Sequence, residues 1–581
     1  MENYDNLMWA QQLHCQISLQ LAAEDLFHSL DERLMPKVFI LGVNTNPSSN
    51  LPFINLECDD CGYCPFHFLH LHETVNRYIK IIDEWSGAEP QIDVIETLGS
   101  SILSEIQRTL RKQPKSNVVE SFVSLPAQIN GYLVFVVTEL NKKVMNSFYT
   151  LSQIQNQAVE GLKLSRSFIE SIIQTYLDAS NNALKAKSQF EFNILSKSRN
   201  ELLSTAAHDF MTTISLAGRN AHNLHMLYEA CNTISSLKYE GEEGLGKMVI
   251  AQRNHPNVKL TMALEEPINI TDFRKVRKFL ELADQKHWLI SDSVYIYGLG
   301  RLVGKYNAHD ESLFVIHFTK HFHWEALHNG KILISVAFRA PSLYNEQINK
   351  ERFYSTISRT FKQIKREQIH SLWEITLEAT KQKHGTILAI SSAAKQEAER
   401  LSKQSFKIKP TQLNRILVGQ LSAIDGAILL DTNSICYGIG VILDGIANHY
   451  GDSSRGARFN SALRYYEHME KKAGIVLVVI SEDGMINLIP ELKDQVNHSA
   501  LLEKIKELEA LSIAEDKDRS KYNRVMSFLN QHSFYFSKEE CYEINELKSK
   551  IENSYRFTEG IKMIYDNFEP NTKMNTSYYF K

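Results

Sequence analysis

The chain has 581 residues, which is too long for one hydrophobic core and indicates roughly three or four domains. Its composition, 43% hydrophobic and 23% charged residues, excludes a disordered or fibrous protein. Lysine and arginine total 64 and aspartate and glutamate total 68, so no excess of positive charge favours non-specific binding to nucleic acid.

The apolar runs of the chain are short. Runs such as residues 132–137 and 475–480 fall far short of the roughly 20 residues that a membrane-spanning helix needs. The first residues include Glu2 and Asp5 and contain no apolar stretch behind a basic start, so they do not resemble a secretory signal. We therefore expect a cytoplasmic protein that spans no membrane and binds no nucleic acid.

Residues 1–90 are expected to form an N-terminal region marked by a cysteine cluster. The chain has seven cysteines, an odd number, and only Cys58, Cys61 and Cys64 lie close together, so we expect reduced thiols and no disulfide framework. Together with His67, the three thiolates are a ligand set suited to a structural zinc ion, and three cysteines could also hold part of an iron–sulfur cluster. The alternative is that these cysteines are reduced, partly buried and free of metal.

The next two regions differ in their sequence patterns. Residues 91–238 carry apolar side chains at three- and four-residue steps with few Gly or Pro, which predicts a helical region. Residues 239–345 are richer in glycine and in short apolar runs, which predicts a small α/β domain. Within it, residues 313–324 predict one half-buried strand, and Asn329-Gly330 predicts a hairpin turn after it.

A helical segment follows. Residues 346–383 keep a near-heptad apolar spacing without an internal Pro or Gly, which predicts a connecting helix. The alternative is an ordinary helix that packs on its own domain. The chain ends in a charged segment, residues 501–581, for which we expect a helical C-terminal tail.

Strand and helix patterns alternate between residues 384 and 500. The strands are predicted at 385–390, 427–430, 435–442, 475–480 and 485–489, and the helices at 393–402 and 457–471. This alternation predicts a mixed β-sheet flanked by helices, so the fold class of the whole chain is α/β multidomain.

Three loop segments stand at the ends of these elements. They begin at Asp425, Gly451 and Ser481, and loops carried on a sheet are where phosphate and metal chemistry usually lies. The middle segment places Arg455 and Arg458 just ahead of a helix, where guanidinium groups and backbone N–H groups can face a polyphosphate. An Asp followed by Gly can hold a divalent cation and leave room for a sugar.

The three segments, in this order, resemble the diadenylate cyclase domain found in the DNA-integrity scanning protein and in membrane-tethered cyclases. They read LSAIDGAILLDTNSICYGIGVILDG, SSRGARFNSALRYY and AGIVLVVISEDGMINLI, and the family has an Asp-Gly-Ala motif, a Gly-Thr-Arg-His-Arg motif opening a helix and a Val-Ser-Glu strand end. The resemblance covers about residues 368–501. It implies a nucleotidyltransferase that condenses two ATP into a cyclic dinucleotide such as cyclic di-AMP, with Mg²⁺ or Mn²⁺.

The resemblance also implies roles for individual residues. Asp425, with Glu482, would hold the metal, and Asp425 would activate a ribose 3′-hydroxyl, while Gly426 admits the nucleotide and Arg458 holds the triphosphate. These four are the expected catalytic residues. The expected ATP-binding residues are Ala427, Leu443, which lies where the family reads adenine, Arg455, Gly456, Asn460, Ser461 and Ser481.

The chain departs from the family at the second motif, where Arg458-Phe459-Asn460 stands in place of Arg-His-Arg. The change removes two charge-capable donors, each worth about 1.5–3 kcal/mol to a bound phosphate. Arg455 could restore one charge. The alternative function is a catalytically degenerate nucleotide-binding protein that signals to a partner.

The resemblance extends to the assembly and to the region upstream. In the family two facing cyclase domains each present one ATP, which implies a homodimer or higher homo-oligomer. Residues 239–345 resemble the sensor modules fused ahead of some cyclase domains, which implies a sensor ligand or protein partner of unidentified chemistry. After residue 501 only Gly560 is a glycine, so the glycine-bearing hairpins of DNA-reading relatives are not expected.

Overall fold

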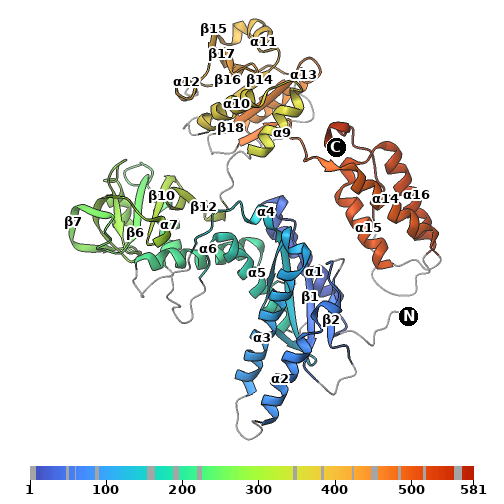
Figure 1. Ribbon diagram of the computed structural model, residues 1–581. Helices are drawn as coiled ribbons and strands as arrows, with labels where there is room; N and C mark the ends of the chain where they lie inside the picture. The colour runs from blue at the N-terminus through green and yellow to red at the C-terminus, as the bar shows by residue number, and fades with distance from the viewer. Residues whose placement is uncertain are drawn as a thin grey trace. The chain divides into compact units, whose positions relative to one another are not determined.

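The computed structural model describes residues 8–46, 51–58, 61–84, 91–152, 164–186, 195–218, 226–343, 350–380, 385–421, 424–445, 456–481, 486–514, 519–554 and 565–580 (Figure 1). The chain divides into two compact units, Met1–Tyr344 and Asn345–Lys581. Within the described ranges no helix is long and apolar enough to cross a membrane.

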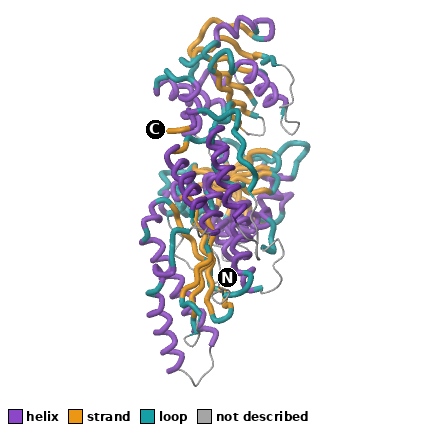
Figure 2. The backbone as a smooth tube through the Cα atoms, turned by 90° about the vertical axis from the view of Figure 1, so that its right-hand side faces the viewer, coloured by secondary structure: helices purple, strands orange, loops and turns teal. Residues whose placement is uncertain are grey.

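The first unit opens on a five-stranded antiparallel sheet with the strand order β2-β1-β5-β3, and β4 also pairs with β5. The strands are β1 (Lys37–Asn44), β2 (Ile54–Glu57), β3 (Val119–Val123), β4 (Ala127–Ile129) and β5 (Tyr132–Asn141). Alternate side chains of β1 and β5 enter two separate hydrophobic cores, one on each face of the sheet. The strands run side by side in both views (Figure 1, Figure 2).

Helices cover both faces of this sheet. One core contains residues of α2 (Leu71–Glu84) and α3 (Gln91–Lys112), and the other contains residues of α1 (Gln12–His28), α5 (Phe168–Lys185), α6 (Arg199–Ser215) and α7 (Leu227–Ser236). A short helix, α4 (Lys142–Met145), follows β5. The prediction of a helical region over 91–238 is therefore wrong at β3, β4 and β5. The strand β5 is buried on both faces, so its apolar run lacks the alternation that distinguishes a strand from a buried helix.

The second sheet of this unit has eight strands in the order β13-β12-β11-β10-β6-β8-β9-β7. All neighbours are antiparallel except β6 and β8. The strands are β6 (Gly246–Ala251), β7 (Val258–Asn269), β8 (Trp288–Ser291), β9 (Tyr295–Leu302), β10 (Leu313–Lys320), β11 (His323–His328), β12 (Lys331–Ala337) and β13 (Ala340–Ser342), with α8 (Phe273–Leu280) between β7 and β8.

The hairpin predicted at Asn329-Gly330 is confirmed, because both residues have positive φ and join β11 to β12. The single strand predicted over 313–324 is instead two strands, β10 and β11, joined at His321 and Phe322. Phe318 pairs with Trp324 in the regular register of the two strands, and the register shifts between Phe318 and Lys320, next to the turn. No glycine or asparagine marks this turn in the sequence.

The second unit opens on a six-stranded mixed sheet, as predicted, with the order β15-β17-β16-β14-β18-β19. The strands are β14 (Thr386–Ser391), β15 (Phe406–Gln412), β16 (Ala427–Leu430), β17 (Ile435–Val441), β18 (Ile475–Ile480) and β19 (Ile486–Ile489). β14 and β16 are parallel and the other pairs are antiparallel. The strand β15 has no counterpart among the strands predicted from the sequence.

Among the described residues, five helices cover this sheet. The core on one face contains residues of α9 (Lys350–Thr360), α10 (Arg366–Ala379) and α12 (Arg415–Leu421), and the core on the other contains residues of α11 (Ala394–Arg400) and α13 (Ala457–Met469). The predicted connecting helix over 346–383 is corrected, because α9 and α10 are separate helices that pack on this domain through Phe353, Ile357 and Leu372.

The described residues of the C-terminal segment form three α-helices with a hydrophobic core of their own, which agrees with the helical prediction as far as Ser554. The helices are α14 (His498–Ile513), α15 (Arg519–Gln531) and α16 (Lys538–Ser554). Residues 565–580 contain no α-helix. The short strands β20 (Val496–Asn497) and β21 (Tyr579–Phe580) pair in parallel and join the last described residues to the start of α14.

Candidate active site

The predicted site lies at one edge of the six-stranded sheet. In the pairing of the strands, Ala427 lies opposite Ile387 on one side and Val441 on the other. Ile480 pairs with Thr386 at the same end of β14. The segment before β16, the segment after β17 and the segment after β18 therefore leave the sheet at a common edge.

The Asp425-Gly426-Ala427 motif enters β16 at this edge. Ala427 is fully buried, while the side chain of Asp425 is 85% exposed. Gly426 has a φ of +114°, and a Cβ atom there would lie 2.6 Å from the carbonyl carbon of Gly440 on β17. Only glycine fits this position without strain. The close packing of β16 on β17 thus fixes the backbone that presents the Asp425 carboxylate.

The helix α13 brings an arginine to the same carboxylate. Gly456 is the N-cap residue and makes no side-chain cap, so the first N–H groups of the helix have no cap from that residue. Arg458 lies in the first turn, and its Nη2 donates a hydrogen bond of 3.0 Å to Asp425 Oδ1. The Arg458 side chain is 32% exposed. The structure therefore brings together Asp425 and Arg458, two of the four predicted catalytic residues.

The other described members of the predicted ATP-binding set lie on α13 and on the segments that follow β17 and β18. Leu443 is buried, and its carbonyl accepts a hydrogen bond of 3.1 Å from Ser461 Oγ, which joins the loop after β17 to α13. Asn460 Nδ2 donates to the carbonyl of Gly456 at 3.4 Å. Ser481 directly follows β18 and is half-buried. Arg455 and Glu482 lie outside the described residues.

A polar network that the sequence analysis did not identify supports the loop after β17. Arg400 Nη2, on α11, donates hydrogen bonds of 2.7 Å to Asp444 and to Glu397, and Tyr465 OH, on α13, donates one of 2.9 Å to Glu397. Hydrogen bonding to Arg400 lowers the pKa of Asp444. Burial pushes the pKa of Glu397 upward, but hydrogen bonds from Arg400 and Tyr465 lower it on balance. The hydrogen bonds thus favour the ionised form of both carboxylates, and Asp444 directly follows Leu443.

The sequence indicates only part of this network. Asp444 directly follows the predicted adenine-binding residue Leu443, and Glu397 and Arg400 stand three residues apart on a predicted helix. Their meeting depends on the fold, because Arg400 and Asp444 are separated by 44 positions and Glu397 and Tyr465 by 68.

The chemistry of the site suits a divalent cation that arrives with its nucleotide. Mg²⁺ is usually held by one or two carboxylates together with substrate phosphates and waters, so it needs no complete cage of protein ligands. The exposed carboxylate of Asp425 meets that requirement. Within the described residues no group of three or more His, Cys, Asp or Glu side chains is placed to hold a metal ion.

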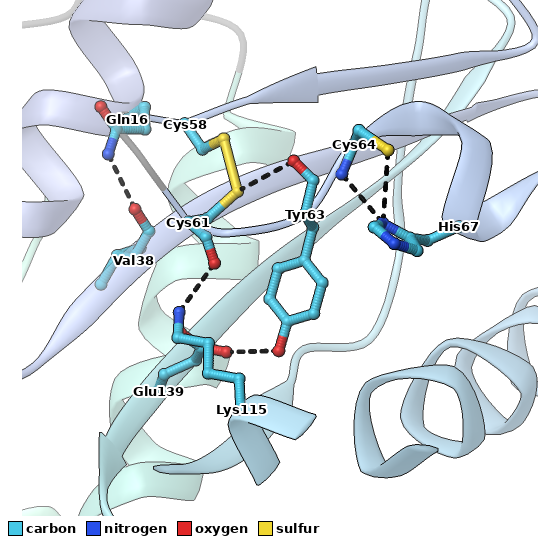
Figure 3. The surroundings of a disulfide bond; sticks show 9 residues. All are labelled: Gln16, Val38, Cys58, Cys61, Tyr63, Cys64, His67, Lys115 and Glu139. Atoms are coloured by element: carbon cyan, nitrogen blue, oxygen red, sulfur yellow. Dashed lines mark hydrogen bonds and ion pairs between the residues drawn. A yellow bond between two sulfur atoms is a disulfide. The ribbon is translucent and has the colours of Figure 1, made fainter. Parts of the chain in front are cut away.

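The N-terminal cysteines are arranged differently from the prediction (Figure 3). Cys58 and Cys61 form a disulfide, with Cα atoms 5.8 Å apart, so the expectation of reduced thiols is wrong for this pair. The two-residue spacing behind β2 allows this close approach. Cys64 is free, and its Sγ lies 3.4 Å from His67 Nδ1. A zinc ion on these four residues remains a prediction, and it would require the disulfide to be reduced.

Three family models match separate parts of the chain. Residues 376–493 match the family DAC, described as "DisA bacterial checkpoint controller nucleotide-binding". Residues 8–211 match DACNG, and residues 225–330 match DACNH, each described as a "Probable sensor domain". No curated protein matches the chain. The chain thus carries, in order, two regions that match probable sensor domains, DACNG and DACNH, and one region that matches the DAC domain.

Proposed function

We propose that the DAC domain condenses two molecules of ATP into cyclic di-AMP, and that the two upstream domains control this reaction. The observation that carries the proposal is the pairing of Asp425 with Arg458 at one edge of the sheet, within a domain that matches the DAC family. An exposed carboxylate and a guanidinium side by side provide one group that could hold a divalent cation and one that could bind a triphosphate.

The reaction joins the 3′-oxygen of one ATP to the α-phosphorus of the other, and pyrophosphate leaves. A second step of the same kind joins the 3′-oxygen of the second nucleotide to the α-phosphorus of the first, which closes the ring and releases a second pyrophosphate. Asp425 would lie at the 3′-hydroxyl, where its carboxylate orients the hydroxyl and takes part in removing the proton. Asp425 and Glu482 would hold Mg²⁺ or Mn²⁺, which neutralises charge on the phosphates when bound.

Arg458 would bind the triphosphate. Its position in the first turn of α13 places the guanidinium near the positive end of the helix dipole, and both favour an anion at this point. In the structure Arg458 is paired with Asp425. On nucleotide binding, the guanidinium would exchange this carboxylate for phosphate oxygens, which frees Asp425 for the metal.

The remaining residues would shape the nucleotide pocket. Gly426 leaves space beside the carboxylate because it has no side chain, and Leu443 and Ala427 would offer an apolar surface to the base. Each domain would hold one ATP, so ring closure requires a second DAC domain facing the first. The active form would therefore be a homodimer or a higher homo-oligomer.

Incubation of the purified full-length protein with ATP and Mg²⁺ or Mn²⁺, followed by mass spectrometry of the nucleotides, tests the proposal. We expect cyclic di-AMP from the wild type and none from Asp425→Asn. Glu399→Gln, which removes an exposed carboxylate from α11 of the same domain, is the matched control and should behave as the wild type. A wild-type protein that binds ATP but forms no product with either metal would refute catalysis and leave a nucleotide-binding role.

A further inference from the structure

We propose that the Cys58–Cys61 disulfide of the DACNG domain is a reversible thiol–disulfide switch, opened by a dithiol reductant and closed by a disulfide oxidant. We further infer that its state sets the rate of the DAC domain, and this second part rests on the cyclase function proposed above. Three observations carry the proposal: the short loop that the bond closes, the unequal exposure of its two cysteines, and the contacts of the segment with a buried carboxylate.

The bond is poorly suited to a purely structural role. It joins residues only three positions apart, and a disulfide across so short a loop removes little entropy from the unfolded chain. The sheet has a hydrophobic core on each face, so most of the buried apolar surface lies away from the bond. A dithiol in a two-residue spacing is, however, well placed to open and close repeatedly, because both sulfurs stay close after reduction.

The burial of the two cysteines indicates which sulfur atom a reductant would attack first. Cys61 is 2% exposed and belongs to the core that contains residues of α2 and α3, whereas Cys58 is half-buried at the margin of the same core. A thiolate of the reductant would attack Cys58 Sγ, and Cys61 Sγ would leave with the electron pair and take up a proton. The second thiol of the reductant then attacks its own sulfur in the mixed disulfide and releases Cys58 as a thiol. The reductant becomes a disulfide, so two electrons and two protons pass to the protein.

The segment that carries the bond is attached to the centre of the first sheet (Figure 3). The carbonyl of Cys61 accepts a hydrogen bond of 2.7 Å from Lys115 Nζ, and the same ammonium group pairs with Glu139. Tyr63 OH donates a hydrogen bond of 2.8 Å to Glu139 Oε1. Glu139 is 1% exposed and lies on β5. A change in the backbone at Cys61 therefore alters the contacts of a buried charge, which is costly to leave unpaired.

β5 belongs to both cores of the sheet. Phe135 and Val137 face the core that contains Cys61, whereas Val134 and Val136 face the core that continues through α5, α6 and α7 to the DACNH sheet. The switch is thus placed on a strand shared with the second sensor domain. Because of this placement, a change in the redox state of Cys58 and Cys61 could alter the packing of residues beyond the DACNG domain.

Cys64 provides an internal control. It is exposed and free, it lies three residues from Cys61, and its sulfur contacts His67 rather than the disulfide. The other four free cysteines, Cys15, Cys231, Cys436 and Cys541, are buried. A reagent that alkylates accessible thiols under native conditions should therefore label Cys64 in the oxidised protein. In the reduced protein it should label both Cys64 and Cys58.

The first experiment equilibrates the full-length protein with mixtures of oxidised and reduced dithiothreitol, blocks thiols by alkylation and counts modified cysteines by peptide mass spectrometry. We expect Cys58 and Cys61 to change together in one two-electron transition. Cys64→Ser should keep the transition, and Cys58→Ser and Cys61→Ser should each abolish it. Cysteines that remain reduced in every mixture, a transition that requires Cys64, or stoichiometric zinc or iron in the purified protein would overturn the switch.

The second experiment compares cyclic di-AMP formation by the oxidised and reduced protein. We expect the two rates to differ at least threefold in the wild type and in Cys64→Ser, and to be equal in Cys58→Ser and Cys61→Ser. Equal rates in a wild type that shows the thiol transition would overturn the regulatory part. If the protein forms no product in either state, the proposed cyclase function and its regulation are both refuted. The thiol titration then still shows whether Cys58 and Cys61 form a reversible disulfide.

Discussion

The substitution Gly426→Ala tests the geometry that presents Asp425. The added Cβ would lie 2.6 Å from the carbonyl carbon, 2.9 Å from the Cα and 3.0 Å from the oxygen of Gly440, all atoms of the neighbouring backbone. No side chain can rotate to relieve these contacts, so β16 and β17 must separate by roughly half an ångström or more. The positive φ of +114° adds strain that alanine does not tolerate well.

The loss in the free energy of unfolding caused by Gly426→Ala can be estimated from the backbone strain and the close contacts together. Positive φ contributes about 1–3 kcal/mol and the overpacked contact about 1–3 kcal/mol, which totals about 2–6 kcal/mol. A domain of ordinary stability, about 5–15 kcal/mol, survives the lower part of this range at 25 °C. Because the displaced backbone carries Asp425, and small misplacements of a reacting group cost large factors in rate, we expect turnover to fall at least tenfold.

The assay has two measurements on the full-length protein. Formation of cyclic di-AMP gives the rate, and differential scanning calorimetry gives the unfolding temperature of the transition that ATP shifts, which we expect to fall by about 4 °C or more. Gly438→Ala on β17 is the matched control, because its added Cβ meets side-chain and backbone atoms no closer than 3.3 Å and its φ is not positive. Unchanged rate and unfolding temperature in Gly426→Ala would refute the reasoning.

Three further predictions follow from the described contacts. Arg458→Ala should weaken ATP binding at least tenfold in calorimetric titration, equal to about 1.4 kcal/mol, while Arg352→Ala, which removes an exposed arginine of α9, should not. Asp444→Asn should raise the KM for ATP severalfold with little change in kcat. Because Arg400 lowers the pKa of Asp444, this carboxylate stays ionised between about pH 8 and pH 5, and its titration should not change the wild-type KM in that range. Burial lowers the pKa of His328, so the folded DACNH domain should lose stability as pH falls from about 7 through that lowered pKa, and His328→Gln should flatten this part of the thermal unfolding profile.

The strands of the cyclase domain could be predicted because each gives a short apolar run with turn residues at both ends. The predicted ranges 427–430 and 475–480 agree with β16 and β18. Both strands are buried on both faces, and their length is too short for a helix. The missed strand β15 is an exposed edge strand that contains Pro410, so it carries neither an apolar run nor an alternating pattern.

The helical and redox predictions failed for different reasons. The near-heptad spacing of residues 346–383 is satisfied by two helices packed on one sheet as well as by one connecting helix, because both bury the same apolar face. The cysteine count gave the number of thiols but not their distances. Only the fold brings Cys58 and Cys61 into bonding range and turns the Cys64 sulfur towards His67.

The sequence predicted the residues expected to contact the nucleotide and the metal, but not the residues that hold the surrounding loops in place. The motif at Asp425 and the arginine at 458 could be recognised because three loop motifs stand in the same order as in the diadenylate cyclase family, although each motif alone is common. Their 3.0 Å contact crosses 33 positions of the sequence, and it depends on β16 and α13 meeting at one edge. The Arg400 network that supports Leu443 binds no expected ligand, so its residues look like ordinary surface charges until the fold joins them. Mutations in this network should therefore change ATP affinity before they change the chemical step, since it positions the loop and touches no reacting atom.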